Sequence, residues 1–452
     1  MKQLKIGSSW IRGVVGNGLT PELVTDFACA FGTYVDGGEV VLGYDSRRSS
    51  PLFAAAVTAG LLSTGTSVAN AGLCATPIVQ YLVRKLRARG GIVVSGSHND
   101  SAWNALKFIN ARGALFNPTE GEELLDLYHA AAFKKARWNE LGRERTVTGF
   151  VERYLEDTIG RLDLASLRSC NFRVAVDAGN GTAGPVVRPL FELLGCKVVL
   201  INEELDGVFA RGPAPSRENM KQLAALMRHI EADVGFAVNS DVDRVGIVTE
   251  SGEALSEEYT FPLVAQHVLR EPGQIVVSTF STSRMIDAVA GGRKARVVRT
   301  KIGEGNVVAR CLNENAVLGG EGSGGVAYLP VVRGFDGFVT MALLLEAMAQ
   351  SGKTIGELSA QLPSYTMKKG VVPSPPDRVY YALEEVRRLY RGENVVLADG
   401  VLVSWPDRWL HVRASTTEPL LRVIVEGEDA QEVERLFEDT VSLVNAVVHG
   451  KS

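Results

Sequence analysis

Apolar and polar positions follow one arrangement three times along the chain. An apolar run is followed by a turn rich in Gly, Ser and Asp, then by a helical stretch and a second apolar run. The paired runs are residues 40–42 with 67–69, 172–176 with 197–201, and 275–277 with 295–298, and the helices between them are predicted over 51–63, 185–194 and 283–290. Continuous Val, Ile and Leu runs alternating with helices indicate mainly parallel sheets covered on both faces. Three such units predict three related α/β domains.

The last part of the chain has a different pattern. Residues 368–376 are Pro-rich and predict a turn-prone linker. A helix over about 379–391, three strands over 395–397, 409–413 and 421–425, and a closing helix over about 430–447 follow. This order predicts a small α+β domain. We therefore expect four domains, over 1–150, 151–252, 253–367 and 368–452.

Composition and charge exclude several classes of protein. The chain has 452 residues, of which 46% are hydrophobic and 22% charged, and a net charge of −4. This balance gives no basic footprint for nucleic acid, and no run approaches the roughly 18 apolar residues of a membrane span. The five cysteines are scattered without a CxxC pair, which argues against a zinc site or a disulfide framework. We expect a cytoplasmic protein that binds neither nucleic acid nor membrane.

The first cluster of polar residues follows the apolar run 90–94. Ser95, Ser97, His98 and Asn99 stand in a turn that can present a hydroxyl group. The alternative is a surface turn in which Ser and Asn cap a helix. A nucleophilic serine would also need a base or a metal ion beside it.

The second cluster follows the apolar run 234–238. Asn239, Asp241 and Asp243 offer hard oxygen ligands within five residues, the kind that Mg²⁺ prefers. The alternative is a solvated acidic turn in which Arg244 pairs locally. Carboxylates directly after a buried strand need partners, which favours the metal site.

Two further clusters lie later in the chain. Five glycines in residues 319–325 let a backbone approach a ligand closely, and Glu321 between them can bond sugar hydroxyls. A flexible hinge is the alternative. Residues 413–419 combine a guanidinium group with three hydroxyls and predict a phosphate cradle, whereas the alternative is a Ser/Thr-rich hairpin.

A fifth motif favours a different function. Residues 179–184 match G-x-G-x-x-G after a strand, which by itself is typical of a dinucleotide-binding dehydrogenase. Asp177 directly before the glycines would repel a pyrophosphate. This interpretation also leaves the four polar clusters unexplained.

In their order and spacing, the four clusters resemble the α-D-phosphohexomutase superfamily, which includes phosphoglucomutases, phosphomannomutases and phosphoglucosamine mutases. The segments 6–16, 19–24, 43–50, 213–220 and 334–349 also resemble parts of that family, so the likeness covers nearly the whole chain. The resemblance implies three related α/β domains and a C-terminal α+β domain around a central cleft. It also implies a reaction in which a phosphoserine exchanges its phosphoryl group with a hexose phosphate through a bisphosphorylated sugar.

The resemblance assigns roles to residues of this sequence. Ser97 would be the phosphorylated serine, and with Asn239, Asp241 and Asp243 it would hold one Mg²⁺. Acid–base work and charge stabilisation would fall to Arg12, His98, Lys107 and Arg244. Substrate contacts would come from Lys301, Glu321, Ser323, Arg413, Ser415, Thr416, Thr417 and Arg422.

Three departures from the family pattern are visible. Asn239 replaces the usual Asp at the start of the metal loop, and Gly325 replaces the His that usually ends the glycine-rich loop. Asp100, the residue after Ser97-His98-Asn99, stands where Pro is usual, and Trp10 stands where Gly is common.

We predict a mutase for glucose or mannose phosphates, a monomer or homodimer activated by a hexose 1,6-bisphosphate. Phosphoglucosamine mutase is the first alternative. A non-catalytic sugar-phosphate-binding protein and the dehydrogenase are the alternatives of other classes.

Overall fold

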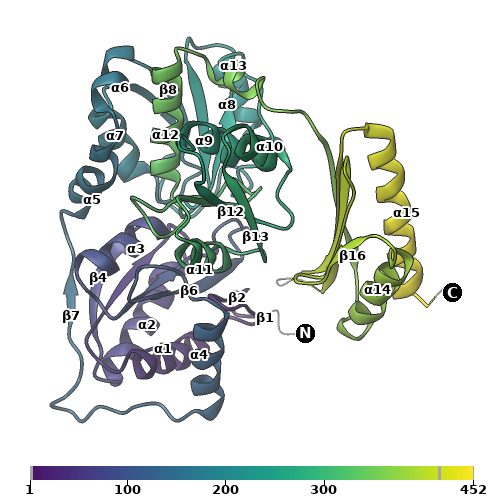
Figure 1. Ribbon diagram of the computed structural model, residues 1–452. Helices are drawn as coiled ribbons and strands as arrows, with labels where there is room; N and C mark the ends of the chain where they lie inside the picture. The colour runs from purple at the N-terminus through teal and green to yellow at the C-terminus, as the bar shows by residue number, and fades with distance from the viewer. Residues whose placement is uncertain (1–3, 416–418, 451–452) are drawn as a thin grey trace.

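The computed structural model describes residues 4–415 and 419–450. The chain folds into four units that follow one another along the sequence (Figure 1). The first three are α/β units with mixed sheets, and the fourth is an α+β unit, so the predicted fold class is confirmed. Among the described helices, none is both long and apolar enough to cross a membrane.

The first unit has a seven-stranded sheet in the order β1-β2-β6-β5-β3-β4-β7. Strands β3, β4 and β5 are mutually parallel, whereas β1, β2 and β6 pair in antiparallel fashion. Its strands are β1 (Leu4–Ile6), β2 (Trp10–Val14), β3 (Glu39–Tyr44), β4 (Ser67–Leu73), β5 (Gly90–Val94), β6 (Trp103–Asn110) and β7 (Glu144–Thr146). Its helices are α1 (Pro21–Val35), α2 (Ser50–Ser63), α3 (Thr76–Lys85) and α4 (Pro118–Ala130).

The second unit has four strands in the order β11-β10-β8-β9. They are β8 (Arg173–Asp177), β9 (Lys197–Ile201), β10 (Val234–Val238) and β11 (Val245–Val248). Its helices are α5 (Phe150–Thr158), α6 (Leu164–Cys170), α7 (Gly184–Leu193) and α8 (Lys221–Met227), with short 3₁₀ turns η1 (Ile159–Arg161) and η2 (Arg217–Met220).

The third unit repeats this plan with the strand order β13-β12-β14-β15. Its strands are β12 (Ile275–Thr279), β13 (Arg296–Thr300), β14 (Leu318–Gly320) and β15 (Val326–Tyr328). It contains η3 (Glu257–Tyr259) and the helices α9 (Thr260–Val268), α10 (Met285–Gly292), α11 (Glu304–Glu314), α12 (Gly337–Ser351) and α13 (Ile355–Ser359). Helix α12 is buried from Gly337 to Met348, because it packs against both α6 and α9.

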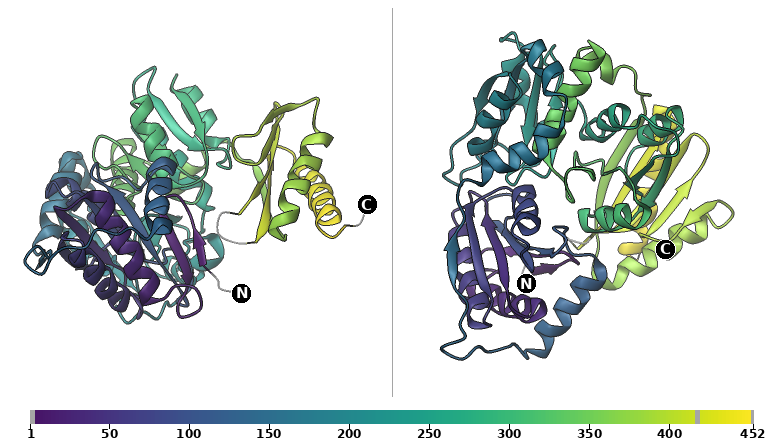
Figure 2. Two further views of the ribbon diagram at one scale, coloured as in Figure 1. Left: turned by 90° about the horizontal axis from the view of Figure 1, so that it is seen from below. Right: turned by 60° about the vertical axis from the view of Figure 1, so that its left-hand side comes forward.

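The fourth unit is a five-stranded antiparallel sheet in the order β16-β20-β19-β18-β17, with two helices against it (Figure 1). Its elements are β16 (Thr366–Pro373), α14 (Pro376–Leu389), β17 (Asn394–Val396), β18 (Val401–Ser404), β19 (Arg408–Ala414), β20 (Leu420–Gly427) and α15 (Ala430–Val448). Figure 2 shows this unit set beside the other three.

The prediction of a linker over 368–376 is wrong. Residues Thr366–Pro373 form β16, which pairs along its whole length with β20 at the edge of the sheet. An edge strand tolerates proline at its end because one side of its backbone has no partner strand. Only the next prolines end the strand, and Pro376 begins α14, where its fixed φ suits the first helical turn.

The apolar side chains gather into unequal cores. The largest is continuous through the first three units, from Val41 in β3 through Phe236 in β10 to Leu345 in α12. The fourth unit has a core of its own, built from residues between Val372 and Val448. The first three units therefore share one packed interior, whereas the fourth unit packs separately.

Candidate active site

Ser97 lies in the turn after β5, in a backbone conformation that serine rarely adopts. Its φ is 50°, in the left-handed region, which costs energy unless the surroundings hold it. Its backbone N–H donates to Ser95 Oγ at 3.0 Å, and Ser95 Oγ donates to Asp45 Oδ2 at 2.7 Å. The two serines of the sequence motif therefore have different positions, and Ser95 supports Ser97.

The 239–243 loop joins β10 to β11 and is also strained. Val242 has φ 59° and is fully buried, and a β-branched residue in this region is a genuine outlier. Its N–H donates to Asn239 O at 3.2 Å, and its carbonyl accepts from Gly337 N at 2.9 Å, at the start of α12. The N-terminus of α12 thus holds the loop in its strained form.

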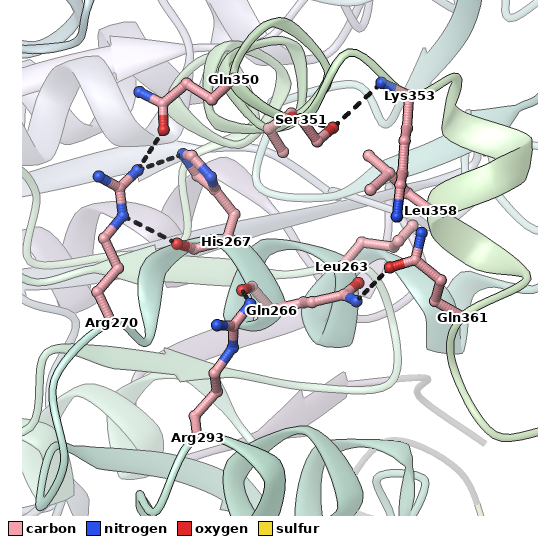
Figure 3. A pocket seen from close by; sticks show the side chains of 11 residues that line it. Leu263, Gln266, His267, Arg270, Arg293, Gln350, Ser351, Lys353, Leu358 and Gln361 are labelled. Carbon is pink, nitrogen blue, oxygen red and sulfur yellow. Dashed lines mark hydrogen bonds between the residues drawn. The ribbon is translucent and has the colours of Figure 1, made fainter.

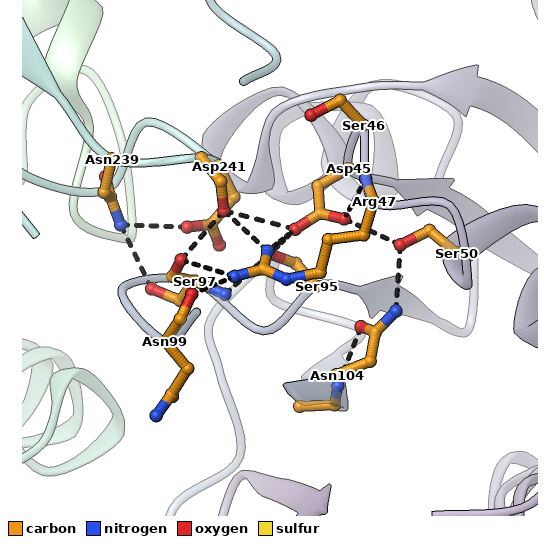
Figure 4. A network of polar contacts seen from close by, with 12 residues as sticks. Asp45, Ser46, Arg47, Ser50, Ser95, Ser97, Asn99, Asn104, Asn239 and Asp241 are labelled. Atoms are coloured by element: carbon orange, nitrogen blue, oxygen red, sulfur yellow. Dashed lines mark hydrogen bonds and ion pairs between the residues drawn. The ribbon is translucent and has the colours of Figure 1, made fainter. Parts of the chain in front are cut away.

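These two loops meet. Asn239 Nδ2 lies 3.0 Å from Ser97 Oγ, 3.0 Å from Asp241 Oδ1 and 2.6 Å from Asp243 Oδ1. Figure 4 shows Ser97, Asn239 and Asp241 pointing toward one another. Residues more than 140 positions apart are therefore neighbours, as the two sequence clusters require if they act together.

Lys107 of β6 joins the same cluster. Its Nζ lies 2.5 Å from Asp241 Oδ2 and 2.6 Å from Asp243 Oδ2. Burial would lower the pKa of Lys107, but the two carboxylates outweigh burial and raise it. Burial would raise the pKa of Asp243, but Lys107 and Arg244 outweigh it and lower that pKa. The lysine is therefore a fixed positive charge and Asp243 a fixed negative one.

The donor set fits a hard cation in part. Ser97 Oγ, Asp241 Oδ1 and Asp243 Oδ1 converge on one point, as oxygen ligands of Mg²⁺ do. The amide of Asn239 presents nitrogen to that point, because its Oδ1 accepts the Arg244 N–H at 3.0 Å. The carboxamide oxygen of Asn239, predicted as a ligand, faces away. Three oxygens of the predicted set are suitably placed and the fourth is not.

A cavity of about 500 Å³ opens beside this cluster and is lined by all four units. The predicted site residues that line it are Arg12, Ser97, His98, Lys107, Asp243, Arg244, Glu321, Ser323, Arg413, Ser415 and Arg422. Lys301 is exposed and is not among the lining residues of this cavity. Thr416 and Thr417 lie outside the described residues. The structure thus brings together most of the predicted site.

The cavity is positively charged near Ser97. Arg12 Nη1 donates to Asn99 Oδ1 at 2.7 Å, while its buried Nε has no hydrogen-bond partner within residues 4–415 and 419–450. Burial and, next, the charge of Arg244 lower the pKa of Arg12 to about 10. Burial and, next, the charges of Arg244 and Arg12 lower the pKa of His98 well below its usual value. Arg12 remains charged at neutral pH and His98 remains neutral, so the site attracts anions and holds an uncharged imidazole.

The glycine-rich loop forms another wall. Glu321 Oε1 accepts the Gly303 N–H at 2.6 Å, and Oε2 accepts from Ser323 Oγ at 3.2 Å. A Cβ on Gly325 would lie 2.3 Å from the Phe335 ring. The phenylalanine therefore occupies the space beside Gly325, which explains why a larger residue is absent from the end of this loop.

The predicted phosphate cradle is at the far end of β19. Arg413 is buried, and its Nε lies 3.5 Å from Asp399 Oδ2. Arg422 of β20 pairs in register with Arg413 across the two strands. Two guanidinium groups therefore stand side by side on the wall contributed by the fourth unit.

Sequence reasoning missed three residues of the site. Thr76 Oγ1 donates to Asp241 Oδ2 at 2.5 Å, and Arg47 is buried beneath the Ser97 turn. Glu304, the first residue of α11, lines the cavity and accepts from Gln80 Nε2 at 2.8 Å. The family-like segment 43–50 includes Arg47 but gives this arginine no role, and no local motif marks Thr76 or Glu304, because their partners lie far away in the sequence.

Glu304 makes stability depend on pH. Burial raises its pKa to about 8, from an ordinary value of 4.5. Between these pH values the unfolded chain binds fewer protons than the folded chain, so stability falls as pH rises. We expect Glu304→Gln to flatten this part of the curve, measured as the denaturation midpoint against pH. Glu438→Gln, at an exposed position of α15, is the control; the prediction fails if the Glu304→Gln curve runs parallel to that of the parent.

The G-x-G-x-x-G segment supports the 239–243 loop. Thr182 N donates to Ser240 O at 2.8 Å, and a Cβ on Gly181 would lie 2.6 Å from Ser240. Asp177 is fully buried and accepts from Arg211 Nε at 2.6 Å. These glycines permit close packing of two loops, which leaves no room for a pyrophosphate.

A second cavity, of about 350 Å³, lies in the third unit among α9, α12 and α13 (Figure 3). Arg270 Nη2 donates to Gln350 Oε1 at 2.7 Å, and Gln266 Nε2 donates to Gln361 Oε1 at 3.3 Å. None of the residues predicted for the site lines it. This second cavity therefore takes no part in the predicted chemistry.

Family models match four successive parts of the chain. The chain matches the phosphoglucomutase/phosphomannomutase alpha/beta/alpha domains I, II and III over residues 3–135, 152–252 and 256–365, and the C-terminal domain of the same family over 370–443. The matched regions together cover most of the chain.

Individual relatives are similar over nearly their whole length. A phosphoglucomutase/phosphomannomutase of Thermococcus kodakarensis is 34% identical, covering 98% of this chain and 99% of the relative. A probable phosphoglucosamine mutase of Pyrococcus abyssi is also 34% identical, covering 98% of each. The crystal structure of a phosphoglucomutase/phosphomannomutase family protein from Burkholderia thailandensis has a TM-score of 0.85, with 28% identity over 98% of each chain. The chain therefore belongs to the phosphoglucomutase/phosphomannomutase family of α-D-phosphohexomutases, which are isomerase-class enzymes.

Proposed function

We propose that this phosphohexomutase interconverts hexose 1-phosphate and hexose 6-phosphate through a phosphoenzyme at Ser97. The observation that carries the proposal is the position of Ser97 Oγ, beside two carboxylates and a lysine and at the edge of a cavity lined by arginines. Phosphoryl transfer requires alignment and charge neutralisation more than covalent help. The contacts of Ser97 supply the alignment, and the cationic side chains supply the charge neutralisation.

The proposed step conserves every group. The bond between phosphorus and Ser97 Oγ breaks as a bond forms from phosphorus to a free hydroxyl of the hexose phosphate. That hydroxyl loses its proton to a base, for which neutral His98 is suited, because its Nδ1 has no hydrogen-bond partner among the described residues. The Ser97 oxygen is left as an alkoxide, and the resulting hexose bisphosphate reverses its orientation in the cavity. Ser97 Oγ then attacks the other phosphorus as the bond from that phosphorus to the sugar oxygen breaks, and the sugar oxygen takes the proton back from His98.

The two ends of the cavity hold different phosphates. Arg12, Lys107 and Arg244 lie beside Ser97, and Arg413 and Arg422 lie on the wall of the fourth unit. One guanidinium group can donate two parallel hydrogen bonds to two oxygens of a phosphate. A hexose phosphate can therefore be held by the distant arginines while its free hydroxyl faces Ser97. A hexose 1,6-bisphosphate added in trace amounts would phosphorylate Ser97 and so act as an activator.

Mg²⁺ would be held by Ser97, Asp241 and Asp243, and when bound it would neutralise phosphate charge. We expect Asn239→Asp to tighten Mg²⁺ binding by about tenfold or more, because a third carboxylate adds charge and has no N–H to present. Calorimetric titration of the protein with Mg²⁺ measures this, with Asn313→Asp, exposed in α11, as the control. Equal affinities in the parent and in Asn239→Asp would contradict the assignment of this loop to a cation.

Glucose or mannose phosphate is the substrate we favour, and glucosamine phosphate is the second candidate. The Thermococcus and Pyrococcus relatives carry names of both kinds. Glu321 lines the cavity, and a carboxylate accepts hydrogen bonds from hydroxyl and ammonium groups alike. This contact is suited to either sugar.

A coupled assay tests the proposal directly. The 1-phosphates of glucose, mannose, glucosamine and N-acetylglucosamine are supplied in turn, with magnesium and a trace of the corresponding bisphosphate, and the 6-phosphate is measured. Turnover of one or more sugars, with one phosphate on Ser97 by intact mass and peptide mapping, is the expected result. Binding of hexose phosphate without turnover or stable phosphate would instead indicate a non-catalytic sugar-phosphate-binding protein.

A further inference from the structure

Arg47 is a charged side chain buried directly beneath the Ser97 turn. It lies in the loop after β3, and only 1% of its surface is exposed. Its guanidinium group stacks over the Phe209 ring at 4.7 Å. A buried charge is costly unless it is paired and hydrogen-bonded, so its contacts need explanation.

The two ends of the guanidinium fork bind different parts of the site. Nη1 is ion-paired with Asp45 and donates to Ser240 Oγ at 2.9 Å. Nη2 donates to the carbonyls of Ser97 at 3.0 Å and of Asn99 at 2.5 Å. Figure 4 shows the group surrounded by Asp45, Ser97 and Asn99. One side chain thus holds the serine turn and touches the 239–243 loop.

The sequence around Arg47 is adapted to this arrangement. A Cβ on Gly96 would lie 2.8 Å from Arg47 Cζ, so only glycine lets the turn approach the guanidinium. Ser240 Oγ also lies 2.9 Å from Ser97 O and 3.1 Å from Asp45 Oδ2. The left-handed backbone of Ser97 is therefore fixed through its carbonyl by Arg47 and Ser240 together.

We propose that Arg47 is the positioning residue that aims Ser97 Oγ at the carboxylate cluster. Arg47 does not line the cavity, so its effect on the reaction passes through Ser97. The inference rests on the proposed function, in which Ser97 carries the phosphoryl group. Lysine cannot replace this arginine, because a single ammonium cannot reproduce a planar fork with two ends.

The test compares Arg47→Lys and Arg47→Met with the parent. Misplacement of a reacting atom by about 1 Å costs on the order of 100-fold in rate. We expect kcat and the rate of Ser97 phosphorylation by glucose 1,6-bisphosphate to fall about 100-fold in both variants, with KM for the hexose 1-phosphate unchanged. Faster amide hydrogen exchange confined to the peptide containing Ser97 is expected alongside.

Arg48→Lys and Arg48→Met are the matched controls. Arg48 also bridges the first two units, because its Nε donates to Asp206 O at 3.3 Å, but it does so from an exposed position. We expect these controls to behave as the parent.

Two results would overturn the proposal. One is near-parental kcat in Arg47→Met, and the other is full rescue by Arg47→Lys, which would reduce the role of Arg47 to charge alone. If Arg47→Met does not fold, Ser240→Ala provides the second test, since it removes one anchor of the Ser97 carbonyl; parental kcat in Ser240→Ala and in Arg47→Lys would then reject the inference. An inactive, unphosphorylated parent protein would instead reject the proposed function, so the two failures are distinguishable.

Discussion

Replacing Ser97 with alanine is expected to abolish mutase turnover and all stable phosphate incorporation. The substitution removes the hydroxyl oxygen that lies 3.0 Å from Asn239 Nδ2 at the point where the two loops meet. Ser95, the other serine of this turn, cannot take its place, because its Oγ is fully buried and bonded to Asp45. Intact mass after incubation with glucose 1,6-bisphosphate, together with the coupled assay, measures both effects.

The matched control is Ser101→Ala, four residues further on, where the hydroxyl lies at an exposed position. We expect this variant to keep parental turnover and one phosphate per chain. Near-normal activity in Ser97→Ala would remove Ser97 from the proposed role. Phosphate on a different residue of the parent, found by peptide mapping, would do the same.

Replacing Asp241 or Asp243 with asparagine is expected to cost at least about 100-fold in kcat/KM, as losses of electrostatic stabilisation do in other enzymes. Each carboxylate is buried and shares the Lys107 ammonium. The isosteric change keeps the shape of the loop but leaves Lys107 with one carboxylate partner and replaces one proposed cation ligand with a neutral group. The lysine then loses an opposite charge, and the transferring phosphoryl group loses charge neutralisation that a cation held at this loop would supply.

Steady-state kinetics at several magnesium concentrations measures this loss, with Asp206→Asn, at an exposed position, as control. Melting temperatures of each variant separate a catalytic loss from unfolding, because breaking a buried ion pair also destabilises the fold. A small loss of activity in both variants would indicate that the loop is a structural turn. It would also remove the support that the carboxylates give to Ser97 as the reactive group.

Much of the fold could be predicted because its signals are local. The apolar runs at 40–42, 172–176 and 275–277 form β3, β8 and β12, one in each of the first three units, and the helices after them begin within about two residues of the predicted positions. The Pro-rich segment 368–376 misled the prediction, because the pairing of β16 with β20 depends on residues more than 40 positions away. Turn propensity is a local signal, and here a distant strand overrides it.

In the site, too, features with a local sequence signal could be predicted, and features set by distant contacts could not. The loops containing Ser97 and Asp241 could be recognised from residue types and family resemblance. The direction of the Asn239 amide could not, since the Arg244 N–H sets it in three dimensions. Arg47 lies in the recognised segment 43–50, but its role could not be predicted, because it depends on carbonyl groups 50 and 52 positions away, and backbone carbonyls have no sequence signature.

The continuous apolar core of the first three units has a mechanical consequence. Three walls of the cavity are built on one packed body, and such interiors yield little. The fourth wall, with Arg413 and Arg422, belongs to a unit with a separate core. The fourth wall can therefore shift as a body without disturbing the packing that aligns the serine with the carboxylates, whereas a shift of any of the other three walls would disturb that packing.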